Sequence, residues 1–374
     1  MTAKIYKVFT INPGSTSTKI ALFHGDEKVF AQNIDHQASE LSQFHSINDQ
    51  LEYRYDVIRK VLAENKVDLT GTDAFSARGG GTCSVEGGVY GVNERLIEDQ
   101  RSGQYVQHPA ALGAQLAELF KKEYGGIACI VNAPDVDEFT DIARITGIKG
   151  VYRQSKIHAL NQKEMCIRLA NDRGQTYSDL NIIVAHIGGG VSVTAHEKGI
   201  MVDSNDIAHG EGPMAPTRIG YIPAASMLKL CESEVDTAEL KLLLTKSGGL
   251  VSHLGTSDAR EVGKMINDGS RYAKIVYDAF IYQIAKEIGA MAAVLKGKVD
   301  AIILTGGISH DKYVVDTLNS YIGYIAEIAV MPGEFEMEAL AAGAIRVMSG
   351  KEDIKTYTGN PVWSAEKFEK AMGI

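Results

Sequence analysis

The sequence is poor in cysteine and has no excess of positive charge. Its four cysteines are scattered, with no C-x-x-C pair and no metal-ligand spacing, so we expect reduced thiols in a cytoplasmic protein. The 47 acidic and 38 basic residues give a net charge of −9. This balance argues against nucleic acid as a main partner, because binding to nucleic acid depends on clustered positive charge.

Long apolar runs are also missing. No stretch of roughly 18 apolar residues occurs, so we expect no membrane-spanning segment and no membrane partner. The first residues lack the apolar core of a secretory signal peptide. At 374 residues, of which 45% are hydrophobic and 23% charged, the chain predicts two folded domains rather than one.

The standard nucleotide-binding signatures are absent, but two glycine- and serine-bearing turns resemble each other. These are residues 11–19 (INPGSTSTK) and 185–193 (AHIGGGVSV), each between apolar strands. Glycine lets a backbone approach an anion, and turn amides and hydroxyls can bind phosphate oxygens. Either turn alone is explained by ordinary turn chemistry, but two copies favour a two-domain phosphotransferase. The candidate phosphate ligands are Asn12, Gly14, Ser15 and Ser17 in the first turn, and His186, Gly188, Gly189, Gly190 and Ser192 in the second.

The order of strands and helices after each turn is similar, which predicts an α/β protein with two domains of like plan. We expect one domain over residues 1–150, completed by residues 338–374, and the other over residues 151–337. Helical patterns are predicted over residues 155–171 and 224–231, and a long apolar-rich helix, with Ile275 on its apolar side, is predicted over residues 271–296. We expect it to be a central or interface helix, which makes a homo-oligomer plausible.

Two arginines and one histidine occupy positions suited to holding anions. Arg78 ends a predicted strand directly before three glycines. Arg218 lies in a loop that two prolines are expected to hold rigid. The planar guanidinium group matches carboxylate and phosphate oxygens. His158 lies near the start of the helix predicted over residues 155–171 and is a candidate donor to a transferring phosphoryl group. The alternatives are surface arginines and a structural histidine, and we favour the functional interpretation, most strongly for Arg218.

The later part of the chain holds candidates for the metal and the nucleotide base. Glu334 and Glu336 lie at the start of a predicted helix and are candidate Mg²⁺ ligands, although acidic residues there also suit the helix dipole. Gly306, Gly307 and Ile308 follow an apolar strand and would let it pass close to an adenine ring. A strand-to-helix turn that needs glycine is the alternative for this segment.

Together with further segments, these motifs resemble the butyrate kinases. The segments, in order, are residues 11–19, 158–163 (HALNQK), 185–190, 210–213 (GEGP), 304–307 (LTGG) and 332–334 (PGE). The resemblance implies membership of the acetate kinase branch of the superfamily that holds actin, sugar kinases and heat-shock chaperones. It therefore implies a two-domain actin-like ATPase fold of duplicated ribonuclease H-like domains, with the active site in the interdomain cleft. It also implies ATP or ADP with Mg²⁺, a homo-oligomer of at least two chains, and the reaction ATP + butyrate ⇌ ADP + butyryl phosphate.

The resemblance also implies roles for single residues. Asn12 would contact phosphate, Arg78 and Arg218 would hold the carboxylate and the moving phosphoryl group, and His158 would stabilise the transition state. The remaining assignments are the second phosphate turn at residues 186–192, the adenosine loop at residues 306–308, and a Mg²⁺-linked glutamate at Glu336, with Glu334 as the alternative.

Two positions depart from the family pattern. Where the family has Val-Asp-Pro, this chain has residues 131–134 (VNAP), so Asn132 replaces a carboxylate, and Asp135 and Asp137 are the alternative candidates to supply one. The family's Pro-Glu-Arg-Ser-Gly is PTRIG here, at residues 216–220. These changes leave open a different short, branched or aromatic acid as substrate, or a catalytically weakened nucleotide-binding sensor.

A carboxylate acceptor agrees with the lack of a recognisable catalytic base. Such an acid has a pKa of roughly 4 to 5 and is ionised at neutral pH, so it needs no base to become a nucleophile. A sugar kinase would need an Asp placed as base for a hydroxyl group. A chaperone would carry an appended peptide-binding domain. Both are therefore less well supported.

Overall fold

The computed structural model describes residues 4–233 and 235–374, which form two compact units. Unit 1 comprises the chain up to Asp137 together with Phe335–Ile374, and unit 2 comprises Glu138–Glu334. We expected the first change of domain at residues 150 and 151. The segment after Asp137 belongs to unit 2 because the Glu138 carboxylate accepts from Lys163 Nζ at 2.9 Å and from the Met201 amide at 2.8 Å.

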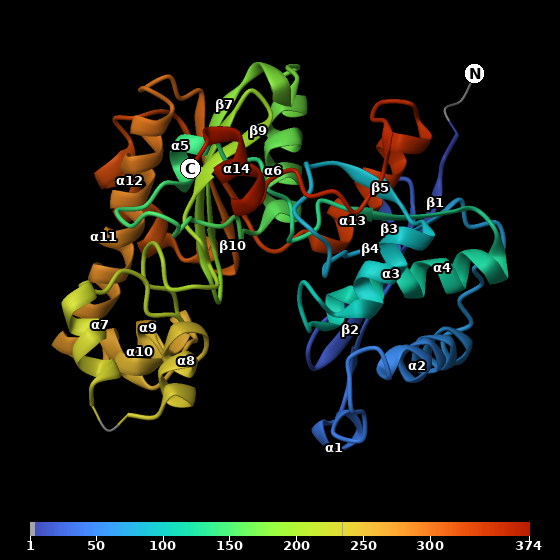
Figure 1. Ribbon diagram of the computed structural model, residues 1–374, viewed down its shortest axis with the longest axis horizontal. Coiled ribbons are helices and arrows are strands. Elements are labelled where there is room, and N and C mark those ends of the chain that lie inside the picture. Colours follow the sequence, from blue (N-terminus) through green and yellow to red (C-terminus); the bar gives the residue numbers. More distant parts are fainter. Residues whose placement is uncertain (1–3, 234) are drawn as a thin grey trace. The chain divides into compact units, whose positions relative to one another are not determined.

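Unit 1 is built on a seven-stranded sheet with the order β12-β5-β6-β4-β1-β2-β3 (Figure 1). Strands β1 to β3 form an antiparallel meander, and β4 and β6 continue the sheet parallel to β1. The strands are β1 (Lys7–Pro13), β2 (Ser17–His24), β3 (Glu27–Asp35), β4 (Ala74–Ala77), β5 (Val89–Gly91), β6 (Ile127–Val131) and β12 (Ile354–Thr356).

The core of unit 1 lies between this sheet and its helices. Phe9 on β1 and Phe75 on β4 pack around Phe120 of a covering helix, with ring centroids 5.4 and 5.9 Å from that of Phe120. The helices are α1 (Ala38–Leu41), α2 (Gln50–Glu64), α3 (Glu94–Ser102), α4 (Gly113–Tyr124), α13 (Glu336–Met348) and α14 (Ala365–Met372), with a 3₁₀ turn at Pro109–Leu112.

Unit 2 is built on a five-stranded sheet with the order β11-β10-β7-β8-β9. Its meander β7 to β9 is antiparallel, and β10 and β11 run parallel to β7. This repeats the order and directions of β3-β2-β1-β4-β6 in unit 1, so the prediction of two α/β domains of like plan is confirmed. The strands are β7 (Asn181–Ile187), β8 (Val191–Glu197), β9 (Ile200–Ser204), β10 (Ala301–Gly306) and β11 (Ile328–Pro332).

Helices α6 and α11 cover opposite faces of the second sheet (Figure 1). Because side chains alternate along a strand, Ala185 and Ile187 of β7 join the core with α11, whereas His186 points to the α6 side. The helices are α5 (Asp141–Arg144), α6 (Ala159–Asp172), α7 (Ala224–Cys231), α8 (Thr237–Thr245), α9 (Gly249–Leu254), α10 (Ala259–Asn267), α11 (Arg271–Val294) and α12 (Lys312–Ile322), with a 3₁₀ turn at Tyr177–Asp179 and another at Gly307–His310.

Helix patterns gave some boundaries correctly and others not. The predicted helix at residues 224–231 coincides with α7, but the helix expected from residue 155 begins only at Ala159, so His158 occupies its N-cap position. Ile275 was expected on the buried side of α11 and is 65% exposed, because the buried face runs through Val276 and Phe280 instead. Within residues 4–233 and 235–374, no helix has the length and apolar character needed to cross a membrane.

Candidate active site

The first glycine turn joins β1 to β2 in unit 1. It is closed by the Gly14 amide, which donates to the Ser17 carbonyl at 2.7 Å. Asn12 is the penultimate residue of β1 and is 4% exposed, and its Nδ2 donates to Oε2 of Glu336 at 2.6 Å. Ser15 is exposed, with its hydroxyl 3.5 Å from Nε2 of His108. The turn therefore presents its tip to solvent while its first residue is tied to α13.

Arg78 and Asn12 meet at the same carboxylate. Arg78 follows β4, and its Nη1 lies 3.4 Å from Oε1 of Glu336. Its amide donates to the Ile11 carbonyl at 2.9 Å, which fixes the backbone beside β1. A Cβ at Gly113 would lie 2.0 Å from the Arg78 carbonyl oxygen, so α4 can approach here only through glycine. Three predicted site residues from three separate segments are thus brought together in unit 1.

A buried arginine that the sequence did not bring to attention lies behind this turn. Arg54 of α2 is 0% exposed, and its Nη1 donates to the Ser17 carbonyl at 3.3 Å and to the Thr18 hydroxyl at 2.9 Å. Nε and Nη2 both donate to Oε1 of Gln50. Burial lowers the pKa of Arg54 to about 10. The signal was its i, i+4 spacing with Gln50 and Ile58 on the inner face of the helix.

The second glycine turn joins β7 to β8 in unit 2 and lies against Arg218. The Gly188 amide donates to the Gly190 carbonyl at 3.0 Å. A Cβ at Gly190 would lie 1.8 Å from Nη1 of Arg218, so glycine leaves the space that the guanidinium group occupies. Across residues 4–233 and 235–374, Nε and Nη1 of Arg218 find no hydrogen-bond partner although both are buried. Burial lowers the pKa of Arg218.

His158 contacts two residues of the second turn. Its Nδ1 lies 2.8 Å from the Ser192 hydroxyl, and its ring stacks on that of His186 with centroids 4.1 Å apart. His186 is 4% exposed, and its Nδ1 lies 3.1 Å from Nδ2 of Asn161, one turn into α6. Three of the predicted site residues, His158, His186 and Ser192, are therefore in contact in unit 2, and Arg218 lies against Gly190 of the same turn.

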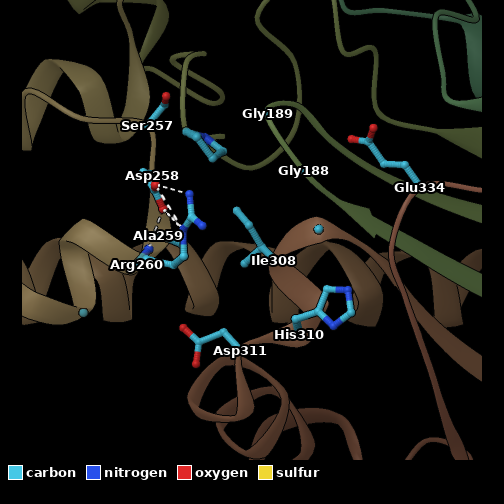
Figure 2. Close-up of a pocket in the computed structure, with 13 residues that line it drawn as sticks. Gly188, Gly189, Ser257, Asp258, Ala259, Arg260, Ile308, His310, Asp311 and Glu334 are labelled. Carbon is cyan, nitrogen blue, oxygen red and sulfur yellow. Dashed lines mark hydrogen bonds and ion pairs between the residues drawn. The ribbon is translucent and has the colours of Figure 1, made fainter. Parts of the chain in front are cut away.

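A cavity of about 700 Å³ opens beside the second turn (Figure 2). Gly188 and Gly189 form one side, and Gly307 and Ile308 of the predicted adenosine loop form another. Gly306 just before them has φ +89°, and a Cβ there would lie 2.4 Å from the Ile187 carbonyl oxygen, so the close approach of β10 to β7 requires glycine. The other lining residues are Pro216, Ser257, Asp258, Ala259, Arg260, Gly263, His310, Asp311 and Glu334.

The sequence did not single out Asp258, Arg260 or Asp311, which also line this cavity. Asp258 and Arg260 form an ion pair on one wall, with Nη2 to Oδ2 at 2.6 Å, and Asp311 lies on the other wall (Figure 2). Asp258 and Asp311 each cap a helix, α10 and α12, and capping residues are common enough that their type alone gave no signal.

The two candidate glutamates fall in different units. Glu334 lines the cavity of unit 2, whereas Glu336 contacts Asn12 and Arg78 in unit 1. No group of three or more His, Cys, Asp or Glu side chains placed to bind a metal exists among the residues that the structure describes. Mg²⁺ usually takes only one or two protein carboxylates and completes its shell with phosphates and water. A single carboxylate next to an amide, as at Glu336 and Asn12, fits that ligand preference.

Comparison with known proteins agrees with these features. The sequence model of the Acetokinase family matches residues 149–325. Butyrate kinase 2 of Clostridium acetobutylicum is 43% identical over 353 residues, which cover 94% of this chain and 99% of the relative. The chain belongs to the acetokinase family. A probable butyrate kinase of Clostridium botulinum (strain Alaska E43) is 42% identical over the same share of each chain. The expected enzyme class, a phosphotransferase with a carboxyl acceptor, is thereby confirmed for the family to which the chain belongs.

Solved structures of acetokinases share the fold. Porphyromonas gingivalis acetate kinase matches with a TM-score of 0.75 at 19% identity, covering 92% of this chain and all of that one. A propionate kinase from Francisella tularensis matches with a TM-score of 0.71 at 18% identity, covering 91% and 99% of the two chains. At these identities the likeness concerns the fold alone, and it confirms the expected α/β class.

The position where acetokinases of the butyrate kinase type were expected to carry aspartate has a structural role in this chain. Asn132 has φ +40°, a left-handed conformation that asparagine tolerates. Its Oδ1 accepts from the Gly88 amide at 2.8 Å, and its own amide donates to the Gly88 carbonyl at 3.0 Å. The nearby Asp135 carboxylate accepts from the amide and hydroxyl of Thr82, both at 3.2 Å.

Proposed function

We propose that this acetokinase transfers the γ-phosphoryl group of ATP reversibly to butyrate, giving ADP and butyryl phosphate. The observation that supports this most is the guanidinium group of Arg218, whose Nε and Nη1 are buried without hydrogen-bond partners in the described chain and which lies against the glycine turn. Such a group is costly unless an anion binds it. The named relatives, butyrate kinases at 42–43% identity, give the anion its chemical class.

The nucleotide is proposed to bind in unit 2. The cavity offers Gly307 and Ile308 to the flat face of a base and the carboxylates of Asp258 and Asp311 to ribose hydroxyls. The adjoining turn at Gly188 and Gly189 would receive the phosphates through its backbone amides. This arrangement would allow the chain to bind a nucleotide although the standard nucleotide-binding signatures are absent from its sequence.

Phosphoryl transfer to a carboxylate needs positive charge and donors rather than a base. The acceptor is ionised at neutral pH, and its difficulty is approaching another anion. Arg218 and Arg78 are proposed to hold the carboxylate and the moving phosphoryl group, while His158 donates to an equatorial oxygen. In this type of reaction the protein chiefly positions groups and stabilises charge, so groups fixed in advance are effective.

Glu336 is proposed to hold Mg²⁺, with Glu334 as the alternative ligand, and Asn12 is proposed to contact phosphate. When bound, the ion neutralises charge on the β- and γ-phosphates. The contribution of the chain is to keep the Glu336 carboxylate oriented through Asn12 Nδ2 and Arg78 Nη1.

The test is a hydroxylamine trap assay with ATP, Mg²⁺ and a panel of acetate, propionate, butyrate, isobutyrate, valerate and phenylacetate. Hydroxamate formed well above the rest with butyrate supports the proposal. A maximum with another acid would indicate an acyl kinase of different specificity. The sequence difference that suggests this alternative is Ile219 in place of the family's serine. No hydroxamate from any acid, with ATP still bound, would favour the sensor alternative.

We also propose a cytoplasmic homo-oligomer. The support is a group of exposed apolar side chains on one short segment of unit 2, Ile142, Ile145 and Ile148, which are 90%, 54% and 68% exposed. Burial against another copy would remove this apolar surface from water. Light scattering of the purified protein measures the mass, and a monomer at micromolar concentration would contradict the proposal.

A further inference from the structure

A chain of hydrogen bonds runs through the interior of unit 2 from His158 to Tyr177. The Tyr177 hydroxyl lies 2.6 Å from Nδ1 of His196, and Nε2 of His196 lies 3.0 Å from Oε1 of Gln162. Nε2 of Gln162 donates to the Ser192 hydroxyl at 2.7 Å. The Ser192 hydroxyl lies 2.8 Å from Nδ1 of His158. Tyr177, His196 and Gln162 take no part in the phosphoryl transfer proposed above.

The periodicities of two elements bring these residues together. Ser192 and His196 lie on the same face of β8, because alternate residues of a strand share a face. Gln162 lies one helical turn after His158 along α6, so both reach that face. Gln162, Ser192 and His196 are each 0% exposed. The chain is therefore shielded from water along its middle, and its protons must be satisfied within it.

The Tyr177 hydroxyl, at one end of this hydrogen-bond chain, fixes which atom donates and which accepts in each hydrogen bond. Burial raises its pKa well above the usual tyrosine value, so it keeps its proton. In the part of the chain that the structure describes, its one hydrogen-bond partner is Nδ1 of His196. A buried hydroxyl proton without an acceptor is costly, so Tyr177 donates and Nδ1 of His196 accepts.

The donor and acceptor roles of the remaining hydrogen bonds follow in turn from His196 to His158. Burial lowers the pKa of His196 well below its usual value, so its ring is neutral and carries its one proton on Nε2. That proton is donated to Oε1 of Gln162, which turns the amide Nε2 toward Ser192. With its oxygen accepting from Gln162, the Ser192 hydroxyl donates its proton to His158. Nδ1 of His158 is therefore an acceptor, and a neutral His158 carries its proton on Nε2.

The charged and titratable neighbours support this direction. Lys163 Nζ lies 5.7 Å from the centre of the Tyr177 ring and is paired with Glu138 at 2.8 Å. Its charge opposes a second positive charge on His196. The Cys166 sulfur lies 3.7 Å from Nδ1 of His196, and burial raises the pKa of this thiol, so it adds no negative charge that would favour a protonated ring.

We propose that Tyr177, His196 and Gln162 are positioning residues that fix the tautomer of His158, so that its Nε2 carries the proton that is donated to the transferring phosphoryl group. The inference rests on the proposed role of His158. The alternative tautomer, with the proton on Nδ1, would present a lone pair from Nε2 to an anionic oxygen and repel it. Fixing the tautomer in advance spares the enzyme that reorganisation in the transition state.

The first test is a ¹⁵N spectrum of the full-length wild-type protein with labelled histidine, at about pH 8, where an ordinary imidazole is neutral. His158 is assigned by comparison with His158→Gln. The expected spectrum shows a protonated Nε2 and an unprotonated Nδ1 at His158. A protonated Nδ1 would overturn the inference without any further variant.

The second test is Tyr177→Phe, which removes only the hydroxyl that sets the direction. We expect Nδ1–H to appear at His158 and kcat for acyl phosphate formation to fall about tenfold or more, since a donor to the transferring group is lost in part of the molecules. The KM values for ATP and acid should change less than about twofold, because binding does not require this tautomer. The control is Tyr90→Phe, another buried tyrosine, whose hydroxyl donates to the Glu86 carbonyl in unit 1.

Each further outcome decides between the proposals. An unchanged spectrum in Tyr177→Phe overturns the inference, whether or not kcat falls, as does an equal loss of kcat in Tyr90→Phe. If the wild type forms no acyl phosphate at all, the proposed function fails, whereas the spectrum still reports whether the chain fixes the tautomer.

Discussion

Nδ2 of Asn12 lies 2.6 Å from Oε2 of Glu336, although 324 residues separate the two in the sequence. Oε1 of the same carboxylate lies 3.4 Å from Nη1 of Arg78. The carboxylate thus has one oxygen toward a neutral donor and the other toward a cation. This arrangement favours Glu336 over Glu334 as the glutamate that acts with the first phosphate turn.

Glu336→Gln should lower kcat by a factor of about 10² to 10³, as expected for losing one charged group that organises the phosphates. It should also shift the Mg²⁺ dependence of the initial rate to higher concentrations, because the amide is a weaker ligand for a hard cation. The measurement is a Mg²⁺ titration of the rate. Glu338→Gln on the same helix, where the carboxylate pairs with Lys28 at 2.7 Å, is the control. Equal Mg²⁺ curves for the wild type and Glu336→Gln would exclude this role.

Gly190→Ala should lower kcat about tenfold or more without changing the melting temperature. The added methyl group would lie 1.8 Å from Nη1 of Arg218 and must displace the guanidinium group. Since that group is the mobile end of a side chain, the fold can yield there while the catalytic position is lost. Gly289→Ala on α11, where a Cβ meets no atom within 4 Å, is the control. Turnover of Gly190→Ala within about twofold of wild type would show that Arg218 does not need its present position.

Arg54→Leu should raise the KM for ATP about tenfold, the effect of one charge-assisted hydrogen bond. The change removes the donor to the Ser17 carbonyl and the Thr18 hydroxyl. These two hydrogen bonds connect the first turn to α2. Steady-state kinetics with ATP as the varied substrate gives the value. Arg59→Leu on the same helix removes a guanidinium group whose side chain is 52% exposed, and should leave the KM unchanged. Similar KM values in the two variants would refute a specific role for Arg54.

Glu287→Gln should become more stable relative to wild type as the pH rises. Burial raises the pKa of Glu287 above the usual glutamate value, and its carboxyl group accepts from the Tyr221 hydroxyl at 3.0 Å. A raised folded-state pKa gives stability that is complete below the unfolded-state pKa and is lost as the pH rises through the folded-state pKa. Glutamine keeps the acceptor and has no such loss.

Urea unfolding from about pH 5 to about pH 8 measures this difference in free energy of unfolding. Glu232→Gln, at an exposed position of the same unit, should follow the wild type at every pH. A difference between Glu287→Gln and wild type that stays constant across the range would show that Glu287 does not ionise with a raised pKa.

Several features could be predicted because their causes are local. The two glycine turns and the ends of α7 follow from residue types within a few positions of each other. The position of Arg78 at the end of a strand was also predictable, because glycines follow a short apolar run there. The start of α6 was placed too early, since apolar spacing alone does not distinguish an extended approach at residues 155–158 from the first helical turn.

The sequence by itself thus determined the class of fold, the two glycine turns and the family. Only the tertiary structure decided which glutamate meets Asn12, that Asp258 and Asp311 share a cavity with Gly307, and that Tyr177 connects to His158 through three other residues. These relations depend on how α6, α10 and α13 pack against their sheets. The position and rotation of a helix on a sheet arise from the whole packed core, and no local pattern records them.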